Sequence, residues 1–233
     1  MTTSRSTSSL ADVDGWQVRR PRLWRVVAGV EVLAAAGAVL MDLLIPSLVL
    51  VAMAVLSLAV RRTGAGSLGL RRVPPGPLAL RMLGFALLWS LVQLGLTMPI
   101  ANHVSGTHQD LSGFADVEGD LALLVVFVVL SWTLAAFVEE LAFRGYLQTR
   151  MREVLGSGRL ALAVVVLVSS LLFGLLHSEQ GWIGVLVVSL DGIAFSVVRY
   201  RYRTLWASVL AHGFNNTIGF IAFYLVGPIY GLW

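Results

Sequence analysis

The sequence contains no cysteine and no lysine, and only 13% of its 233 residues are charged. Without cysteine, the chain can form neither a disulfide nor a thiolate metal site. All 17 basic residues are arginine. The scarcity of charge accompanies 57% hydrophobic residues and a mean hydropathy of +0.82, which are far from the values of a soluble domain. The composition therefore predicts an integral membrane protein.

Seven apolar segments are long enough to cross a bilayer, whose hydrocarbon core is about 30 Å thick and needs roughly 20 helical residues. They lie at 24–41, 43–60, 82–99, 121–143, 160–177, 182–198 and 205–226. None shows the strand-like alternation that a β-barrel requires. The predicted fold class is all-α, a polytopic membrane bundle of about seven transmembrane helices.

The polar, Ser- and Thr-rich residues 1–21 are predicted to be a disordered cytoplasmic tail. They lack the order of features expected of a cleaved signal peptide. Residues 22–233 are predicted to be one membrane-embedded helical domain.

The connections between the apolar segments alternate in charge. Arginines occupy the second, fourth and sixth connections, whereas the third carries acidic residues and no arginine. The positive-inside rule then places the N-terminus in the cytoplasm and the chain in the cell membrane. Because the arginines lie beside apolar runs, the pI near 10 indicates orientation signals, and no nucleic-acid partner is expected.

Ionisable residues inside an apolar segment are costly, by about 2.5–3.5 kcal/mol each, and are functional candidates by default. The stretch AFVEELAFRG places Glu139 and Glu140 one helical turn before Arg144. Residues i and i+4 share a helix face, so Glu140 can pair with Arg144. Glu139 lies about 100° round the helix and lacks that partner, which suits a desolvated general base. Alternatively, both carboxylates only mark the cytoplasmic end of the segment.

Two histidines follow in later apolar segments. His177 ends the fifth segment, with Phe173 one turn earlier, and such a histidine alone is more often an interfacial or packing residue. His212 and Asn216 share one face of the seventh segment, where they could donate hydrogen bonds to a developing oxyanion. An interhelical polar clamp is the alternative interpretation of that pair. Taken together with the glutamates, these residues indicate acid–base chemistry within the membrane.

The sequences EELAFRG, FGLLH and HGFNN resemble the EExxxR, FxxxH and HxxxN motifs of the CPBP family. That family contains the type II CAAX prenyl endopeptidases and bacteriocin-processing and immunity proteins. The resemblance covers about residues 110–225, the predicted protease core, and implies an all-helical intramembrane endopeptidase. In the implied mechanism, Glu139 and His177 activate a water, and His212 and Asn216 stabilise the oxyanion. The remaining motif residues support the site: Glu140, Arg144 and, packed beneath His177, Phe173.

A metal-free mechanism is the favoured prediction for the cofactor. Glu139, His177 and His212 are also a plausible zinc-ligand set with an open fourth position, so a metal-dependent mechanism stays open. The expected partners are the bilayer and a membrane-anchored protein or peptide substrate, with a lipidated CAAX-type protein as one candidate. The oligomeric state is not predicted.

Two other functions remain as alternatives. A non-catalytic scaffold or bacteriocin-immunity protein would keep the fold without needing Glu139. A transporter or proton relay would show repeats or paired broken helices, which the sequence lacks. Of the remaining ionisable residues, Glu31 and Asp191 are expected to pair with nearby arginines or to line the cavity, in structural roles. His103 and His108 are expected to be solvated.

The depths of the motif residues pose a geometric problem. Counted from neighbouring arginines at about 1.5 Å per residue, Glu139 lies roughly 17 Å deep, His177 roughly 27 Å and His212 roughly 13 Å. Straight parallel helices would keep these groups apart. Tilted helices, a fourth helix lengthened through Arg144, or a water-filled cavity would be needed to join them.

Overall fold

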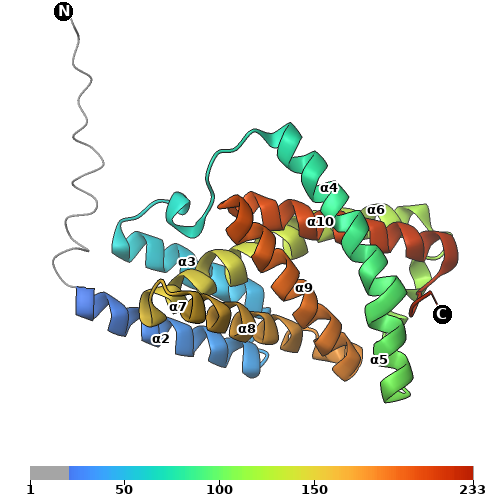
Figure 1. Ribbon diagram of the computed structural model, residues 1–233, viewed down its shortest axis with the longest axis horizontal. Helices are drawn as coiled ribbons and strands as arrows, with labels where there is room; N and C mark the ends of the chain where they lie inside the picture. Colours follow the sequence, from blue (N-terminus) through green and yellow to red (C-terminus); the bar gives the residue numbers. More distant parts are fainter. Residues whose placement is uncertain (1–20, 233) are drawn as a thin grey trace, which may run out of the picture.

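The computed structural model describes residues 21–232, so nearly all of the predicted tail lies outside the described residues. All regular structure within that range is helical, with no β-strand, which confirms the all-α fold class (Figure 1). The α-helices are α2 (Pro21–Leu40), α3 (Pro46–Arg61), α4 (Pro75–Val92), α5 (Met98–Ser105), α6 (Leu121–Leu130), α7 (Gln148–Leu155), α8 (Arg159–Leu175), α9 (Gly181–Tyr202) and α10 (Leu205–Val226).

Short segments of other helix types complete the fold. Three are π-helical: η2 (Gln93–Thr97), η4 (Ser131–Glu139) and η5 (Leu141–Leu147). Three are 3₁₀ turns: η1 (Ala65–Leu68), η3 (Ser112–Val117) and η6 (Ser178–Gln180). Through the π segments, α4 continues into α5 and α6 continues into α7.

Five helices are long and apolar enough to cross a membrane. They are Arg22–Leu40, Pro75–Ser105, Leu121–Leu155, Ser178–Tyr202 and Leu205–Val226. Helices α3 and α8 are apolar but only 16 and 17 residues long. The protein is thus a multi-pass helical membrane protein, whereas the expected number of seven crossings is not confirmed.

Some expected boundaries are wrong because the helices extend beyond the apolar runs. Helix α4 begins at Pro75, inside the VPPGP stretch expected to be a turn, because proline is well suited to the first helical position. Arg81 therefore lies within a helix. Arg150 and Arg152 likewise lie in α7, since the fourth apolar helix extends to Leu155. Polar surface at a helix end does not interrupt backbone hydrogen bonding, so hydropathy underestimates helix length.

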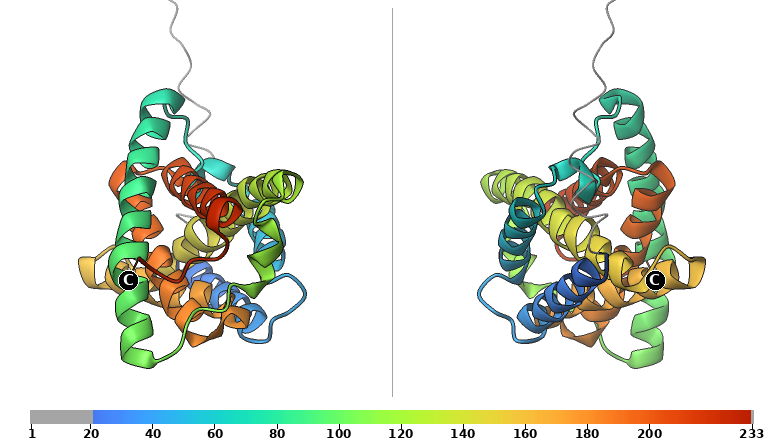
Figure 2. Two further views of the ribbon diagram at one scale, coloured as in Figure 1. Left: turned by 90° about the vertical axis from the view of Figure 1, so that its right-hand side faces the viewer. Right: turned by 90° about the vertical axis from the view of Figure 1, so that its left-hand side faces the viewer.

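Helices α2, α3, α7 and α8 gather on one side of the molecule, and α4, α6 and α10 on the other, with α9 running obliquely between α8 and α10 (Figures 1 and 2). Small residues allow α8 and α9 to approach closely. A Cβ atom added at Gly174 would lie 2.1 Å from Ser189 Oγ, and one at Gly192 would lie 2.8 Å from Ser170 Cβ. Such contacts are typical of helix pairs in membranes.

An ion-pair cluster joins α2, α3 and α7. Arg61 lies 2.8 Å from Glu31 and 2.9 Å from Glu153, and Arg150 also pairs with both carboxylates. The expectation that Glu31 pairs with nearby arginines is confirmed. His103 and His108 are both exposed, as expected.

The two ends of the bundle differ in charge. Arginines flank the start of α2, the α3–α4 connection, the α7–α8 connection and the α9–α10 connection, all at one end. The connections at the opposite end contain no arginine: 41–45, 106–120, 176–180 and 227–232. We refer to this second end as the arginine-free end.

Candidate functional site

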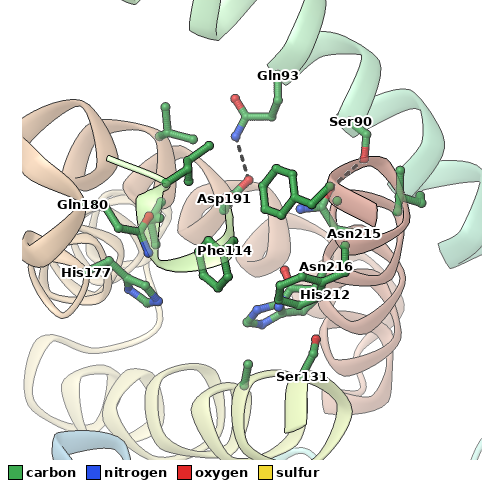
Figure 3. A pocket seen from close by; sticks show the side chains of 18 of the residues that line it. Ser90, Gln93, Phe114, Ser131, His177, Gln180, Asp191, His212, Asn215 and Asn216 are labelled. Carbon is green, nitrogen blue, oxygen red and sulfur yellow. Dashed lines mark hydrogen bonds between the residues drawn. The ribbon is translucent and has the colours of Figure 1, made fainter. Parts of the chain in front are cut away.

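A cavity of about 470 Å³ lies in the half of the bundle nearer the arginine-free end (Figure 3). Most of its wall is apolar, contributed by α6, η4, α9, α10 and the 106–120 connection. Its polar lining comprises Ser90, Gln93, Gln109, Ser131, Glu139, His177, Glu179, Gln180, Asp191, His212, Asn215 and Asn216.

All four residues expected to be catalytic line this one cavity. Glu139 comes from the end of η4, His177 from the turn after α8, and His212 and Asn216 from α10. In Figure 3, His177 lies on one side of the cavity, and His212 and Asn216 lie together on another. The arrangement brings together the three motifs, which are far apart in sequence.

Glu140 and Arg144 lie behind the cavity wall and form the expected ion pair. Glu140 is 0% exposed and Arg144 is 1% exposed. The Glu140 Oε1 atom lies 3.0 Å from Arg144 Nη1 and 3.1 Å from His212 Nδ1. The contact with His212 was not foreseen from the sequence. Glu140 therefore orients His212 in addition to neutralising Arg144.

Phe173 is buried at the centre of the motif residues. The guanidinium carbon of Arg144 lies 4.0 Å from its ring centroid, and the rings of His177 and His212 lie 5.2 and 6.0 Å away. The Phe173 backbone carbonyl lies 3.1 Å from His177 Nδ1. The Phe173 ring thus packs against both histidine rings, and its backbone carbonyl orients the ring of His177.

Both histidines have Nδ1 engaged away from the cavity. His212 donates from Nδ1 to the Glu140 carboxylate, and His177 donates from Nδ1 to the Phe173 carbonyl. Such second contacts determine which ring nitrogen remains free. Nε2 is therefore the reactive atom of each ring. A neutral ring accepts a hydrogen bond at Nε2, whereas an imidazolium donates one.

Glu140 pairs through Oε1 with Arg144 and His212, whereas no ion pair is found for Glu139 among residues 21–232. The Oε2 atom of each carboxylate is buried and has no hydrogen-bond partner in that range, so Glu139 has such an acceptor without any ion pair beside it. A buried acceptor without a donor is costly, whereas a water that donates to it removes the cost. The two adjacent carboxylates thus occupy chemically different environments, as expected from their positions on the helix.

The π-helical segments were not predicted, although they flank the glutamate pair of the first motif. Segment η4 ends at Glu139 and η5 begins at Leu141. A π-turn closes its hydrogen bond one residue later than an α-turn and commonly occurs at functional sites. The continuous helix from Leu121 to Leu155 is the lengthened fourth helix, one of the three solutions considered for the depth problem.

Helix α10 approaches η4 closely at Gly213. A Cβ atom added there would lie 2.6 Å from the Trp132 ring, and Trp132 Nε1 donates to Thr217 Oγ1 at 3.1 Å. This close approach lets His212, the neighbour of Gly213, reach Glu140. No hydropathy pattern would reveal it.

Asp191 also lines the cavity, one of the two placements expected for it. Trp89 Nε1 and Gln93 Nε2 both donate to its Oδ1 atom, at 2.6 and 2.8 Å. Figure 3 shows the contact with Gln93. Asp191 could have been identified as a site residue by the same signal as Glu139 and Glu140, because it is an ionisable residue within an apolar segment.

Glu139, His177 and His212, the residues considered as zinc ligands, all line this cavity. Within the described range 21–232, no group of three or more His, Cys, Asp and Glu side chains is arranged to hold a metal ion. We therefore derive no catalytic step through one.

Comparison with known proteins finds one family model that matches part of the chain. Residues 121–218 match the family model described as Type II CAAX prenyl endopeptidase Rce1-like. The match runs from the start of α6 into α10 and includes all three motifs. No curated protein and no solved structure matches the chain.

Proposed function

We propose that the protein belongs to the CPBP family and is an intramembrane endopeptidase. The Rce1-like match of residues 121–218 supports this proposal. The family implies a membrane protease. The finer proposal is glutamate-dependent hydrolysis of a peptide bond in a membrane-associated protein or peptide, such as a lipidated CAAX-type protein. The observation that carries it is the convergence of Glu139, His177, His212 and Asn216 on one cavity.

In the proposed first step, a water molecule donates one hydrogen bond to Glu139 and the other to Nε2 of His177. Glu139 accepts the proton as the water oxygen bonds to the carbonyl carbon of the substrate. The carbonyl oxygen becomes an oxyanion, which receives hydrogen bonds from the Asn216 amide and Nε2 of His212. The C–N bond then breaks, and Glu139 returns the proton to the departing amine. The products are an amine and a carboxylic acid, which ionises to the carboxylate by releasing the second proton of the water.

The charges around the cavity suit this assignment. Glu140 and Arg144 form a neutral pair, so the ionised Glu139 is the unbalanced charge of the motif. An imidazolium at His212 balances it and supplies the Nε2 donor that the oxyanion requires. The Glu140 carboxylate accepts a hydrogen bond from Nδ1 of that ring, at 3.1 Å. These contacts support a mechanism in which protein groups alone activate the water, and we propose that mechanism.

We further propose that the cavity serves the outer side of the membrane. The positive-inside rule assigns the arginine-rich end to the cytoplasm. The cavity lies toward the arginine-free end, where the 106–120 and 176–180 connections contribute to its wall. Substrates would therefore enter from the extracytoplasmic side.

The test is a comparison of protein termini in host membranes that contain the native chain or Glu139→Gln at matched expression. Loss of a general base typically lowers a rate by about 10²–10⁴, so new termini should disappear in the variant. The matched control is Glu118→Gln, which removes an exposed carboxylate outside the cavity and should leave the termini unchanged.

The scaffold or immunity alternative makes the opposite prediction. Identical termini with both chains, together with a host phenotype that both support, would reject the endopeptidase and favour a non-catalytic protein on the same fold.

A further inference from the structure

The cavity contains a second carboxylate that the proposed mechanism does not use. Asp191 is held by two donors, the Trp89 indole and the Gln93 amide, and both bind the same oxygen, Oδ1. Neither of these two bonds involves the other carboxylate oxygen, Oδ2. One oxygen therefore fixes the side chain, and the other remains available at the cavity wall.

Buried acceptors without donors lie on the same wall. Gln93 is only 5% exposed, its Nε2 is committed to Asp191, and its Oε1 has no hydrogen-bond partner. Gln109 is 7% exposed and donates from Nε2 to Gln180 at 2.7 Å, which leaves its own Oε1 without a partner. Unsatisfied buried acceptors are unfavourable. This part of the cavity therefore requires a ligand that donates hydrogen bonds.

The charge of the lining gives the ligand its sign. Glu139, Glu179 and Asp191 line the cavity, and none of its lining residues is an arginine. Since the imidazolium proposed at His212 balances Glu139, the remaining acidic groups of the lining are Glu179 and Asp191. Acidic groups at the wall of a low-dielectric cleft attract a cation strongly. An N–H-rich cation satisfies both the charge and the orphaned amide oxygens.

Asp191 lies close to the catalytic groups. Phe195 follows it by four residues on α9, so both side chains occupy one helix face. The Phe195 ring stacks on His212 with a centroid separation of 4.9 Å and an interplanar angle of 19°. Asp191 is thus displaced by one helical turn, about 5.4 Å, from the level of His212. A substrate residue one or two positions from the scissile bond would reach it.

We propose that Asp191 and the Gln93 amide oxygen form a subsite for a cationic side chain, arginine or lysine, next to the scissile bond of the substrate. This inference rests on the proposed endopeptidase function and names the substrate class for the same cavity. The apolar wall accommodates the hydrocarbon stem of the side chain, and the two oxygens bind its N–H groups.

The experiment uses the full chain in proteoliposomes with an acyl-anchored library of randomised decapeptides, whose cleavage products are identified by mass spectrometry. The best-cleaved peptide is then made with arginine or citrulline, a neutral isostere, at the selected position. Native protein should prefer arginine by about 10–100-fold in kcat/KM, because a hydrogen bond to a charged group discriminates on that scale. Asp191→Asn keeps an acceptor for Trp89 and Gln93 and should reduce the preference to about 3-fold or less.

The control is Asp116→Asn, which removes an exposed carboxylate at the same end outside the cavity and should retain the preference. Glu139→Gln supplies a chain for binding measurements without cleavage. Cleavage without enrichment of arginine or lysine, or a preference unchanged in Asp191→Asn, would overturn the subsite and leave the endopeptidase intact. If no peptide is cleaved, enrichment of arginine or lysine among the library peptides that Glu139→Gln retains, lost when Asp191→Asn is added, would support the subsite and reject the endopeptidase. Retained peptides without that enrichment would overturn both.

Discussion

The buried contacts of Glu140 allow its role in stability to be separated from its role in catalysis. Glu140→Gln preserves the shape of the side chain but removes the charge that neutralises Arg144, 3.0 Å away. Both residues are almost completely inaccessible to solvent. Removing one partner of a buried ion pair leaves an uncompensated charge and typically costs about 3–5 kcal/mol of folding free energy. We expect a loss of that size from Glu140→Gln.

The double variant Glu140→Gln/Arg144→Met removes both charges. Methionine keeps an apolar stem against the Phe173 ring, over which the Arg144 guanidinium lies at 4.0 Å. Because replacing a whole buried pair by apolar groups is often neutral, the double variant should recover most of the lost stability. Its activity should not recover, since His212 still lacks the carboxylate that accepts the hydrogen bond from its Nδ1. We expect the rate to fall by about 10²–10³, as it does when an enzyme loses one oxyanion donor.

Stability is measured by SDS-induced unfolding in mixed micelles and activity by the appearance of new termini. The reasoning would be refuted if Glu140→Gln lay within about 1 kcal/mol of the native chain. It would also be refuted if the double variant were no more stable than the single one, or if activity followed stability in both variants.

Two further predictions follow from the packing and the charge distribution. Gly174→Ala should destabilise the α8–α9 pair by about 1–3 kcal/mol or more, because the new Cβ would lie 2.4 Å from the Val185 carbonyl oxygen. SDS unfolding checks this, with Gly29→Ala as the control because a Cβ there meets no atom within 4 Å. The orientation of the chain in the membrane can be tested by labelling, because the native sequence has no cysteine. Ser178→Cys at the arginine-free end should react with a membrane-impermeant maleimide in intact cells, whereas Ser157→Cys should react only after permeabilisation. The reverse labelling pattern would contradict the proposed outward-facing cavity.

Much of the architecture follows from local sequence features. Apolar runs predicted helices because a chain in lipid must satisfy its backbone groups internally. All seven runs are helical, yet two of these helices are too short to count as spans on length alone. Boundaries were less predictable, as at Pro75 and Leu155, since polar residues continue a helix beyond its apolar part.

The candidate site could be predicted in part. The motif spacing indicated the Glu140–Arg144 pair, because an i, i+4 relation is local to one helix. The contact between Glu140 and His212 joins residues 72 positions apart and depends on the close approach of α10 to η4 at Gly213. The donors that hold Asp191 could not be predicted for the same reason, since they lie on α4 and η2.

The sequence by itself determined the helical membrane class, the asymmetric distribution of arginine and the set of motif residues, because hydropathy, charge and short-range spacing are properties of the chain. The tertiary structure alone decided that these residues share one cavity at the arginine-free end and that His177 and His212 each keep Nε2 free. These features depend on helix crossings, π-turns and small-residue contacts, in which side chains distant in sequence meet through packing that no local pattern encodes.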